Sequence, residues 1–237
     1  MKIKKFLACA LAALAIPTAT WAQEENEENG VYVEMEANVV SSYVWHGQYL
    51  GGLSVQPSLT IGWNDLSLNV WGSAGIGDES HREIDLSLGY ELGNFSLGLT
   101  DYWFLESGQM ENFLNYAAHS TVHTLEASIG YDLGFMSLGW STYWGGSDYD
   151  EEDNRQFTSY IQANVPFTLG GFEGEATVGA TPWGSELYGA NRFMVCETSV
   201  ALSKELKLTP TFSMNTTGKF VLNPATGHTF FVLGLGF

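Results

Sequence analysis

The sequence has few of the residues that cross-link small domains. It contains only two cysteines, Cys9 and Cys196, in 237 residues, and Cys9 lies in an N-terminal segment that we expect to be removed. We therefore expect no internal disulfide and no metal centre built from thiolates. Basic residues are also few, with 9 Lys and Arg against 27 Asp and Glu and a formal net charge of −18. This balance argues against nucleic acid as a partner, because an acidic surface repels phosphate groups.

Long apolar runs and hydrolase signatures are missing as well. After the N-terminal segment, no stretch approaches the roughly 20 apolar residues that a membrane-spanning helix needs. No Gly-x-Ser-x-Gly turn, which holds the nucleophile of many hydrolases, occurs. The His119–Ser120 and Ser80–His81 pairs are the nearest candidates for an outer-membrane lipid hydrolase, but neither has the His-x-Ser spacing of those enzymes. We predict that the protein is not an enzyme and has no catalytic residue, resident metal or cofactor.

The N-terminal residues have the layout of a secretory signal peptide. Lys2, Lys4 and Lys5 precede an apolar run from Phe6 to Ile16, and small residues around Ala22 suit cleavage after it. A partial lipoprotein signal ends at Cys9, but it follows the lysines too closely. We predict a signal peptide over residues 1–22, an acidic periplasmic leader over 23–30 and an outer-membrane β-barrel over 31–237.

Glycine (27 residues), aromatic residues (14%) and regular alternation are what the sequence has in quantity. From Val31 onward, apolar and polar residues alternate with a period of two, which predicts strands with one apolar face. The predicted fold is all-β, a transmembrane antiparallel up-and-down β-barrel of about 12 strands. A soluble β-sandwich also alternates, but it does not need the 9–11 residues that a tilted membrane strand needs. The predicted strands span residues 31–45, 53–63, 66–76, 83–92, 95–104, 123–133, 136–144, 156–167, 172–181, 193–202, 206–216 and 229–237.

The last strand is apolar on one face up to its final residue. We expect its outward side chains to close the barrel in a bilayer, because a frayed terminus would not end on a bare apolar strand. The ending also resembles the C-terminal signature of bacterial outer-membrane barrels, which the outer-membrane assembly machinery reads. The residues of this predicted assembly signal are Phe231, Leu233, Leu235 and Phe237.

Connections and aromatic residues indicate the orientation of the barrel. Short turns, the last of them at Lys204–Glu205, alternate with longer loops, as a barrel with both termini in the periplasm requires. Aromatic residues gather near strand ends, which suits two membrane interfaces. We place the protein in the outer membrane of a Gram-negative bacterium, in contact with the lipid bilayer and lipopolysaccharide. The predicted belts contain Trp63, Tyr90, Phe95, Tyr131, Phe167, Phe172 and Phe237 near the short turns, and Trp45, Trp103, Trp144, Phe157 and Phe193 near the long loops.

The inward faces of the predicted strands are acidic. A lumen lined with carboxylates attracts cations, so we expect passive diffusion of small cationic or neutral solutes, although the same charges can simply solvate the lumen. Twelve strands fall between barrels filled by side chains and open porins, so a narrow pore and a plugged lumen both fit. A non-conducting barrel that binds a ligand or partner through its outer loops is the alternative. The predicted lumen-lining residues are Glu34, Glu36, Asp85, Glu91, Glu126, Asp132, Glu173, Glu175, Glu197 and Lys207.

Two loops and one misplaced charge stand out. Residues 105–122 form the longest loop, which either folds into the channel or stays outside as a lid or disordered segment. Residues 148–153 are acidic, and a solvated loop or a divalent-cation site would both explain them. Asp101 falls on the lipid-facing side of its strand, so we expect it near the outer rim or beside a bulge.

The segment Val39-Val40-Ser41-Ser42-Tyr43-Val44-Trp45-His46-Gly47, followed by Val55-Gln56-Pro57-Ser58-Leu59, carries a family resemblance. It resembles the opening of the TorF-like porin family, a bacterial outer-membrane family of unknown function. Members begin with a Ser-x-Tyr-x-x-Arg-Gly strand, a short Ser/Gly loop and a Pro-containing second strand. This chain has His46 where the family has Arg. The resemblance implies an outer-membrane barrel with no established substrate and carries over no catalytic residue.

Overall fold

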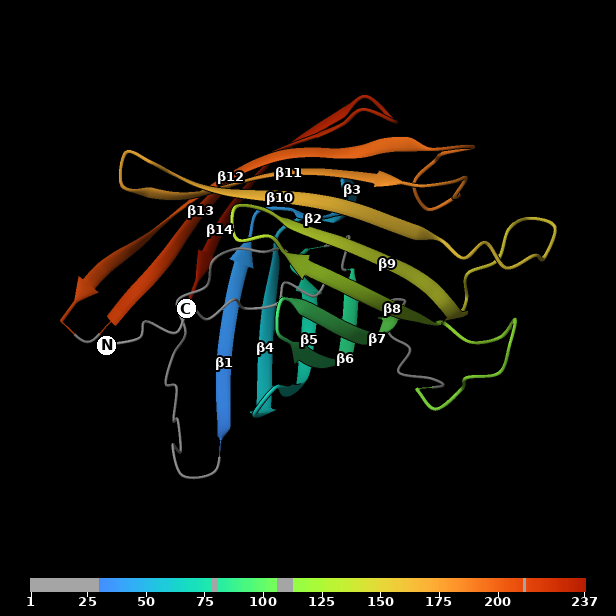
Figure 1. The fold of residues 1–237 in the computed structure, drawn as a ribbon, viewed down its shortest axis with the longest axis horizontal. Helices are drawn as coiled ribbons and strands as arrows, with labels where there is room; N and C mark the ends of the chain where they lie inside the picture. Colours follow the sequence, from blue (N-terminus) through green and yellow to red (C-terminus); the bar gives the residue numbers. More distant parts are fainter. Residues whose placement is uncertain (1–29, 78–80, 106–112, 211) are drawn as a thin grey trace.

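The chain forms a closed antiparallel β-barrel of twelve strands with a separate two-stranded hairpin, β2–β3 (Figure 1). The computed structural model describes residues 30–77, 81–105, 113–210 and 212–237, so the predicted signal peptide and nearly all of the acidic leader lie outside the described residues. The strands are β1 (Val31–Val40), β2 (Tyr43–Trp45), β3 (Gln48–Gly51), β4 (Ser54–Trp63), β5 (Leu66–Gly75), β6 (Arg82–Leu92), β7 (Phe95–Leu105), β8 (His123–Asp132), β9 (Ser137–Gly146), β10 (Ser159–Leu169), β11 (Phe172–Thr181), β12 (Met194–Thr209), β13 (Phe212–Asn223) and β14 (His228–Gly236).

The alternation in β14 has the predicted orientation. Phe231 is 61% exposed, whereas its neighbour Val232 is 2% exposed. Because successive side chains of a strand point to opposite faces, Phe231, Leu233 and Leu235 lie on the outer surface and Gly234 and Gly236 face the lumen. The fold class predicted from the sequence is confirmed.

The barrel closes where β1 meets β14, and this seam is short. The paired residues run from Asn38–Gly236 to Val40–Gly234. Backbone hydrogen bonds between Ala37 and Phe237 extend the seam at one end. At the other end, the Ser41 amide donates to the Leu233 carbonyl and the Leu233 amide donates to Ser41 Oγ. Over this length, closure pairs the edges of the first and last strands, which an open sheet would leave exposed.

The two ends of the barrel differ in their connections. At one end, called the turn end, short connections join β4 to β5, β6 to β7, β8 to β9, β10 to β11 and β12 to β13. The opposite end, called the loop end, carries the longer connections and the β2–β3 hairpin. The last loop-end connection, between β13 and β14, is short as well, in contrast to the predicted long loop.

Several strand boundaries predicted from the sequence are wrong. The first strand does not continue to Trp45, because the chain bends at Ser41–Ser42 and turns inward. The turn predicted at Lys204–Glu205 is absent, since β12 continues to Thr209. Lys204 and Glu205 form cross-strand pairs in β12, because charged side chains are tolerated near the end of a membrane strand. Residues 217–223, predicted as loop, belong to β13.

The outer surface is apolar and carries aromatic residues near both ends. Exposed aromatic side chains lie near the turn end at Trp63, Phe95 and Phe172, and near the loop end at Trp144 and Phe193. Such a broad apolar surface is rare on a soluble monomer. Among the described residues, no helix is long and apolar enough to span a membrane.

Candidate functional site: a hairpin inside the barrel

The β2–β3 hairpin lies within the barrel and packs against the inward faces of strands around the wall. Its turn consists of His46 and Gly47, with φ of 47° and 76°. Positive φ at both central residues is the feature of a type I′ turn, which matches the twist of a two-stranded hairpin. Trp45 pairs with Gln48 across this turn. Trp45, expected in the aromatic belt at the membrane surface, therefore lies in the lumen.

His46 is held between aromatic rings at the tip of the hairpin. Its ring centroid lies 3.8 Å from that of Trp45 and 3.6 Å from that of Tyr160 of β10, with interplanar angles of 25° and 9°. Nδ1 of His46 lies 3.0 Å from the hydroxyl of Tyr188, which comes from the connection between β11 and β12. Burial lowers the pKa of His46 to about 3, an effect that Glu197 opposes and Lys219 reinforces. The docked ring is therefore neutral at neutral pH.

Gly47 meets the opposite wall closely. A Cβ added to Gly47 would lie 2.0 Å from the carbonyl oxygen of Cys196, which is a steric clash. Glycine fits here because it has no Cβ. The side-chain amide of Asn223 in β13 donates to the Gly47 carbonyl at 3.0 Å. Cys196 follows apolar Met194 by two positions, which would place both on the outer face, but it is fully buried beside the hairpin. The reason is a register shift between β11 and β12 next to Gly179, which changes the alternation there.

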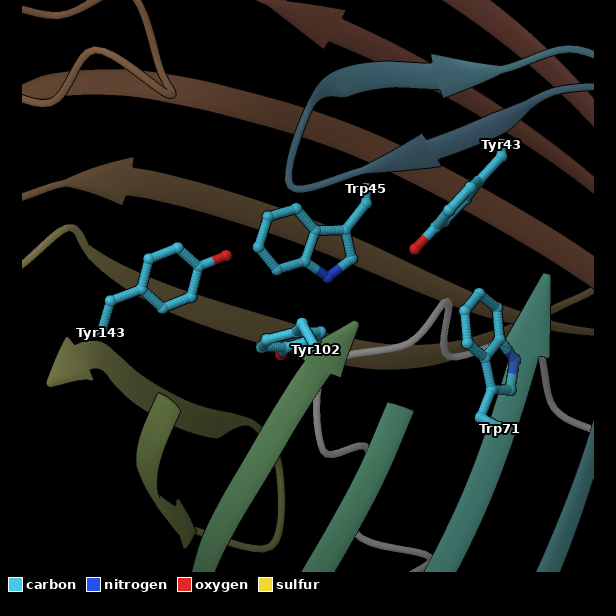
Figure 2. Packing of buried hydrophobic residues seen from close by; sticks show 5 residues of the cluster. All are labelled: Tyr43, Trp45, Trp71, Tyr102 and Tyr143. Atoms are coloured by element: carbon cyan, nitrogen blue, oxygen red, sulfur yellow. The ribbon is translucent and has the colours of Figure 1, made fainter. Parts of the chain in front are cut away.

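A cluster of aromatic side chains joins the hairpin to the wall, as Figure 2 shows. The ring centroids of Tyr43 and Trp71 of β5 are 5.6 Å apart, and those of Trp45 and Tyr102 of β7 are 5.9 Å apart. Tyr143 of β9 completes the cluster, 6.0 Å from Tyr102. Aromatic pairs at such distances add to the apolar burial that holds them in place.

The other face of the hairpin packs on the seam of the barrel. Val44 forms a buried cluster with Val40 of β1, Val221 of β13 and Val232 of β14. Branched aliphatic side chains pack closely and leave little room for water. The hairpin thus contacts the wall on both sides, and it occupies the loop-end half of the lumen.

The carboxylates predicted to line the lumen lie at three levels. Asp85, Glu126 and Glu197 are buried beside the hairpin. Glu34, Glu36 and Glu175 are partly exposed on β1 and β11. The remaining ones, Glu91, Asp132 and Glu173, lie toward the turn end. There Asp132 caps a turn by accepting a hydrogen bond from the Gly134 amide. Lys207 is exposed near the end of β12.

Glu197 is fully paired with donors. Its Oε1 lies 3.0 Å from Lys219 Nζ and accepts from Ser199 Oγ at 2.8 Å, while Oε2 accepts from the Tyr160 hydroxyl at 2.9 Å. The counter-charge to Glu197 is thus Lys219 rather than Lys207. The sequence pattern does not identify Lys219, because it predicts a loop over residues 217–223 and so gives no inward face for this part of β13.

The described part of the long loop packs on the outside of the barrel. Phe113 lies against Trp103, with ring centroids 4.7 Å apart. The Tyr116 hydroxyl donates to Asp101 Oδ2 at 2.6 Å, and His123 Nδ1 lies 2.8 Å from Asp101 Oδ1. Trp103 is therefore buried rather than part of an exposed belt. Residues 113–122 lie outside the lumen, and residues 106–112 lie outside the described part of the chain.

Asp101 lies beside a bulge, as predicted. It pairs with Leu125, next to the register shift between β8 and β9 at Leu125/Glu126. Nδ1 of His123 lies 2.8 Å from Asp101 Oδ1, and Nε2 of His123 lies 2.8 Å from the Phe113 carbonyl oxygen. These contacts surround a carboxylate on the outer face with hydrogen-bond donors, which lowers the cost of placing it there.

The acidic segment 148–153 is folded by its own hydrogen bonds. Asp150 Oδ1 accepts from the amides of Glu152 and Asn154, and Asp148 Oδ2 accepts from the Thr158 amide. Within the described ranges, no group of three or more His, Cys, Asp or Glu side chains is arranged to hold a metal ion.

The hydrolase candidate does not form a catalytic arrangement. His119 Nδ1 lies 2.8 Å from Asp153, but Ser120 Oγ donates to the Ala117 carbonyl and lies 3.3 Å from Asn115 Nδ2. Since a catalytic serine must donate to its base, the geometry of this pair gives no support to nucleophilic catalysis. Ser80 of the second pair lies outside the described residues.

A sequence signal for the hairpin was present. A two-residue His-Gly step between Tyr-Val-Trp and Gln-Tyr-Leu has glycine at the second turn position, as a type I′ hairpin favours. Large aromatic residues at inward positions, such as Tyr102 and Tyr160, were a second signal, because they fill a lumen. Glu83, which is buried on the inward face of β6, was also missed.

Comparison of this chain with known proteins finds similar proteins only among solved structures. No family model and no curated protein matches the chain. A mutant of the Rh. blastica porin is similar at 12% identity, covering 88% of this chain and 73% of that chain, with a TM-score of 0.39. An outer membrane channel from Pseudomonas putida F1 is similar at 14% identity, covering 88% of this chain and 94% of that chain, also with a TM-score of 0.39.

Proposed function

We propose that the protein is an outer-membrane channel through which small cationic or neutral solutes diffuse passively. The observation that carries the proposal is the closed wall with two different faces. Outward side chains such as Phe231 and Leu233 are apolar and exposed, whereas the inward faces carry Ser, Thr, Asn, Glu and Gly. An apolar outer face suits a lipid bilayer, and a polar inner face suits a water-filled lumen.

The proposed orientation places the turn end in the periplasm and the loop end outside the cell. Short periplasmic turns and longer outer connections are typical of outer-membrane barrels. The N-terminal signal peptide, contact with lipopolysaccharide at the loop end and recognition of the C-terminal strand by the assembly machinery belong to this proposal. The resemblance to the TorF-like porin family supports it at the level of the opening segment.

Cation preference follows from the charge of the inward face. Glu34, Glu36 and Glu175 are partly exposed to the lumen, and the matching basic residue Lys219 is already engaged by Glu197. Carboxylates in a narrow lumen raise the local concentration of cations and exclude anions. The hairpin narrows the route at the loop end, so we expect a small conductance.

A second function is favoured by the tight packing of the hairpin. Tyr43 and Val44 are almost completely buried, as expected if the hairpin closes the lumen to ions. The protein would then be a non-conducting barrel that binds a ligand or partner through its outer connections. The two functions differ in whether the wild-type protein carries ions.

The test is the reversal potential of the purified protein in planar bilayers under a tenfold KCl gradient. The proposal predicts discrete steps and a potential of the sign expected for K⁺. Glu34→Gln should shift the potential toward zero, because it removes a lumen charge. Glu152→Gln, which changes an exposed loop carboxylate, should leave it unchanged. A potential of the opposite sign contradicts cation preference, and a silent bilayer favours the non-conducting barrel.

A further inference from the structure

The lumen contains a pair of buried carboxylates, one of which contacts the neighbouring His81. Glu83 and Asp85 of β6 are 2% and 5% exposed, and their side chains hydrogen-bond to each other. Two carboxylates in such contact must share a proton or bind a cation, because two negative charges at this distance repel strongly. Glu126 of β8 adds a third acidic group nearby.

One oxygen of this pair lacks a donor. Oδ1 of Asp85 is buried without a hydrogen-bond partner. The neighbouring carboxylates are better supplied, since Glu83 contacts His81 Nε2 at 3.0 Å and Glu126 accepts from the Tyr102 hydroxyl at 3.1 Å. A buried carboxylate oxygen without a donor costs free energy, so the site calls for an additional N–H or O–H group.

Aromatic rings flank the same carboxylate. Asp85 pairs across the sheet with Trp71 on β5 and with Tyr102 on β7, so both rings lie beside it on the inward face. Tyr43 of the hairpin hydrogen-bonds to Glu83 and its ring lies 5.6 Å from that of Trp71. Figure 2 shows these rings converging from the hairpin and the wall. Aromatic faces next to carboxylates are the surroundings that organic cations prefer.

We propose that Glu83 and Asp85, together with the rings of Trp71 and Tyr102, bind the ammonium group of a small protonated amine. An ammonium group brings three N–H donors, one of which satisfies Asp85 Oδ1 while another reaches Glu83. Its alkyl part lies against the rings. A metal ion fits less well, because no three His, Cys, Asp or Glu side chains in the described ranges form a metal-binding group. The inference rests on the proposed function, since it names the solute class for the same lumen.

We expect the amine to reach this site from the turn end. Toward that end, the next inward residues of β6 are Ser87, which is only partly buried, and Gly89. The side chains of β6 at these positions are small, whereas the hairpin covers the site from the loop end. The site therefore lies on the periplasmic side of the hairpin in the proposed orientation.

The test is calorimetric titration of the full chain in detergent micelles at neutral pH, with propylammonium chloride as the probe. We expect saturable binding of propylammonium, and much weaker binding of tetramethylammonium, which has no N–H, and of propanol, which has no charge. Asp85→Asn should weaken propylammonium binding by about tenfold or more, the loss expected for a hydrogen bond between charged groups. Glu91→Gln is the matched control on the same inward face of β6 and should change binding less than about twofold.

Two outcomes overturn the inference: no saturable binding to the wild type, or equal weakening by Asp85→Asn and Glu91→Gln. If Asp85→Asn does not fold, Trp71→Leu replaces it and should weaken binding through loss of the ring face. Binding in micelles does not require conduction. Cation-selective conduction without amine binding therefore refutes the site alone, and amine binding with silent bilayers refutes the channel alone.

Discussion

At the scale of single residues, the docked hairpin depends on two positions in its turn. Gly47 fits because it has no Cβ, and His46 fits because its neutral ring stacks between Trp45 and Tyr160. Both have positive φ, which glycine adopts without cost and which histidine adopts more readily than most residues. Changes here should affect docking of the hairpin before they affect the barrel.

Gly47→Ala should release the hairpin. The new Cβ would overlap the Cys196 carbonyl oxygen, so the turn cannot keep its place against β12. We expect a larger single-channel conductance than in the wild type. Gly93→Ala is the matched control, because Gly93 also has positive φ but no atom lies within 4 Å of its added Cβ. It should cost about 1 kcal/mol of stability and leave the conductance unchanged, and an equal effect of both variants would exclude the clash as the cause.

Acidification should weaken docking through His46. The pKa of His46 is lowered to about 3 by burial in the docked state, against about 6.5 for a free histidine. Docking is therefore most favourable above about pH 6.5 and loses up to about 1.4 kcal/mol per pH unit as the pH falls toward 3. Conductance should rise between about pH 7 and pH 4.5. His46→Asn, which keeps a side chain suited to positive φ, should show no such rise.

At the scale of elements, the described part of the long loop is held to the outer wall where Tyr116 donates to Asp101 of β7 and the Phe113 carbonyl contacts His123 of β8. Asp101 and His123 themselves form a buried pair, whereas His119 of the loop forms an exposed pair with Asp153 of the next connection. His123 and Asp101 have side-chain exposures of 0% and 17%, whereas His119 and Asp153 have 51% and 73%. Solvent screens the exposed pair, so it contributes little. The buried pair should decide whether residues 113–122 stay on the wall.

Asp101→Asn should therefore make this loop more sensitive to protease. The variant weakens the contacts to Tyr116 and His123, and cleavage in residues 113–122 should become several times faster in folded protein. Asp153→Asn is the control and should cleave at nearly the wild-type rate. Conductance should be the same in both, because the loop lies outside the lumen. A conductance change in Asp101→Asn alone would contradict this placement.

Most strands could be predicted from the sequence because a bilayer and a wet lumen impose a period of two on every strand. β11 matches its predicted range completely, and β14 differs by one residue at each end. The boundary between β12 and β13 failed because Lys204 and Glu205 look like a turn but alternate in step with Leu206 and Leu208. Local polarity alone does not distinguish a turn from a strand end at the membrane surface.

The hairpin could not be predicted from the same pattern. Its residues continue the alternation of β1, and what turns them inward is contact with distant strands. Tyr160, Cys196 and Asn223 meet the turn from far along the chain. The pairing of Glu197 with Lys219 required the register of β13, which the sequence pattern did not supply.

At the scale of the whole molecule, closure depends on a short seam and an apolar last strand. Phe237 pairs with Ala37 through backbone hydrogen bonds, and its ring lies 6.3 Å from that of Phe212. Removal of Phe237 should lower the yield of folded barrel in the outer membrane more than it lowers the yield of refolding in micelles, because it also removes the predicted assembly signal. Heat-modifiable migration on gels measures both yields. An equal loss in both would reduce Phe237 to a structural role.

The β2–β3 hairpin narrows the lumen of a barrel with an apolar outer wall. The most direct test replaces residues 43–51 with a short Gly-Ser linker and compares single-channel conductance with that of the wild type under identical salt. We expect a severalfold larger, still cation-selective conductance for the replaced protein, because the charged wall is retained and the obstruction is gone. Equal conductance of the two folded proteins, or silence of both, would contradict it.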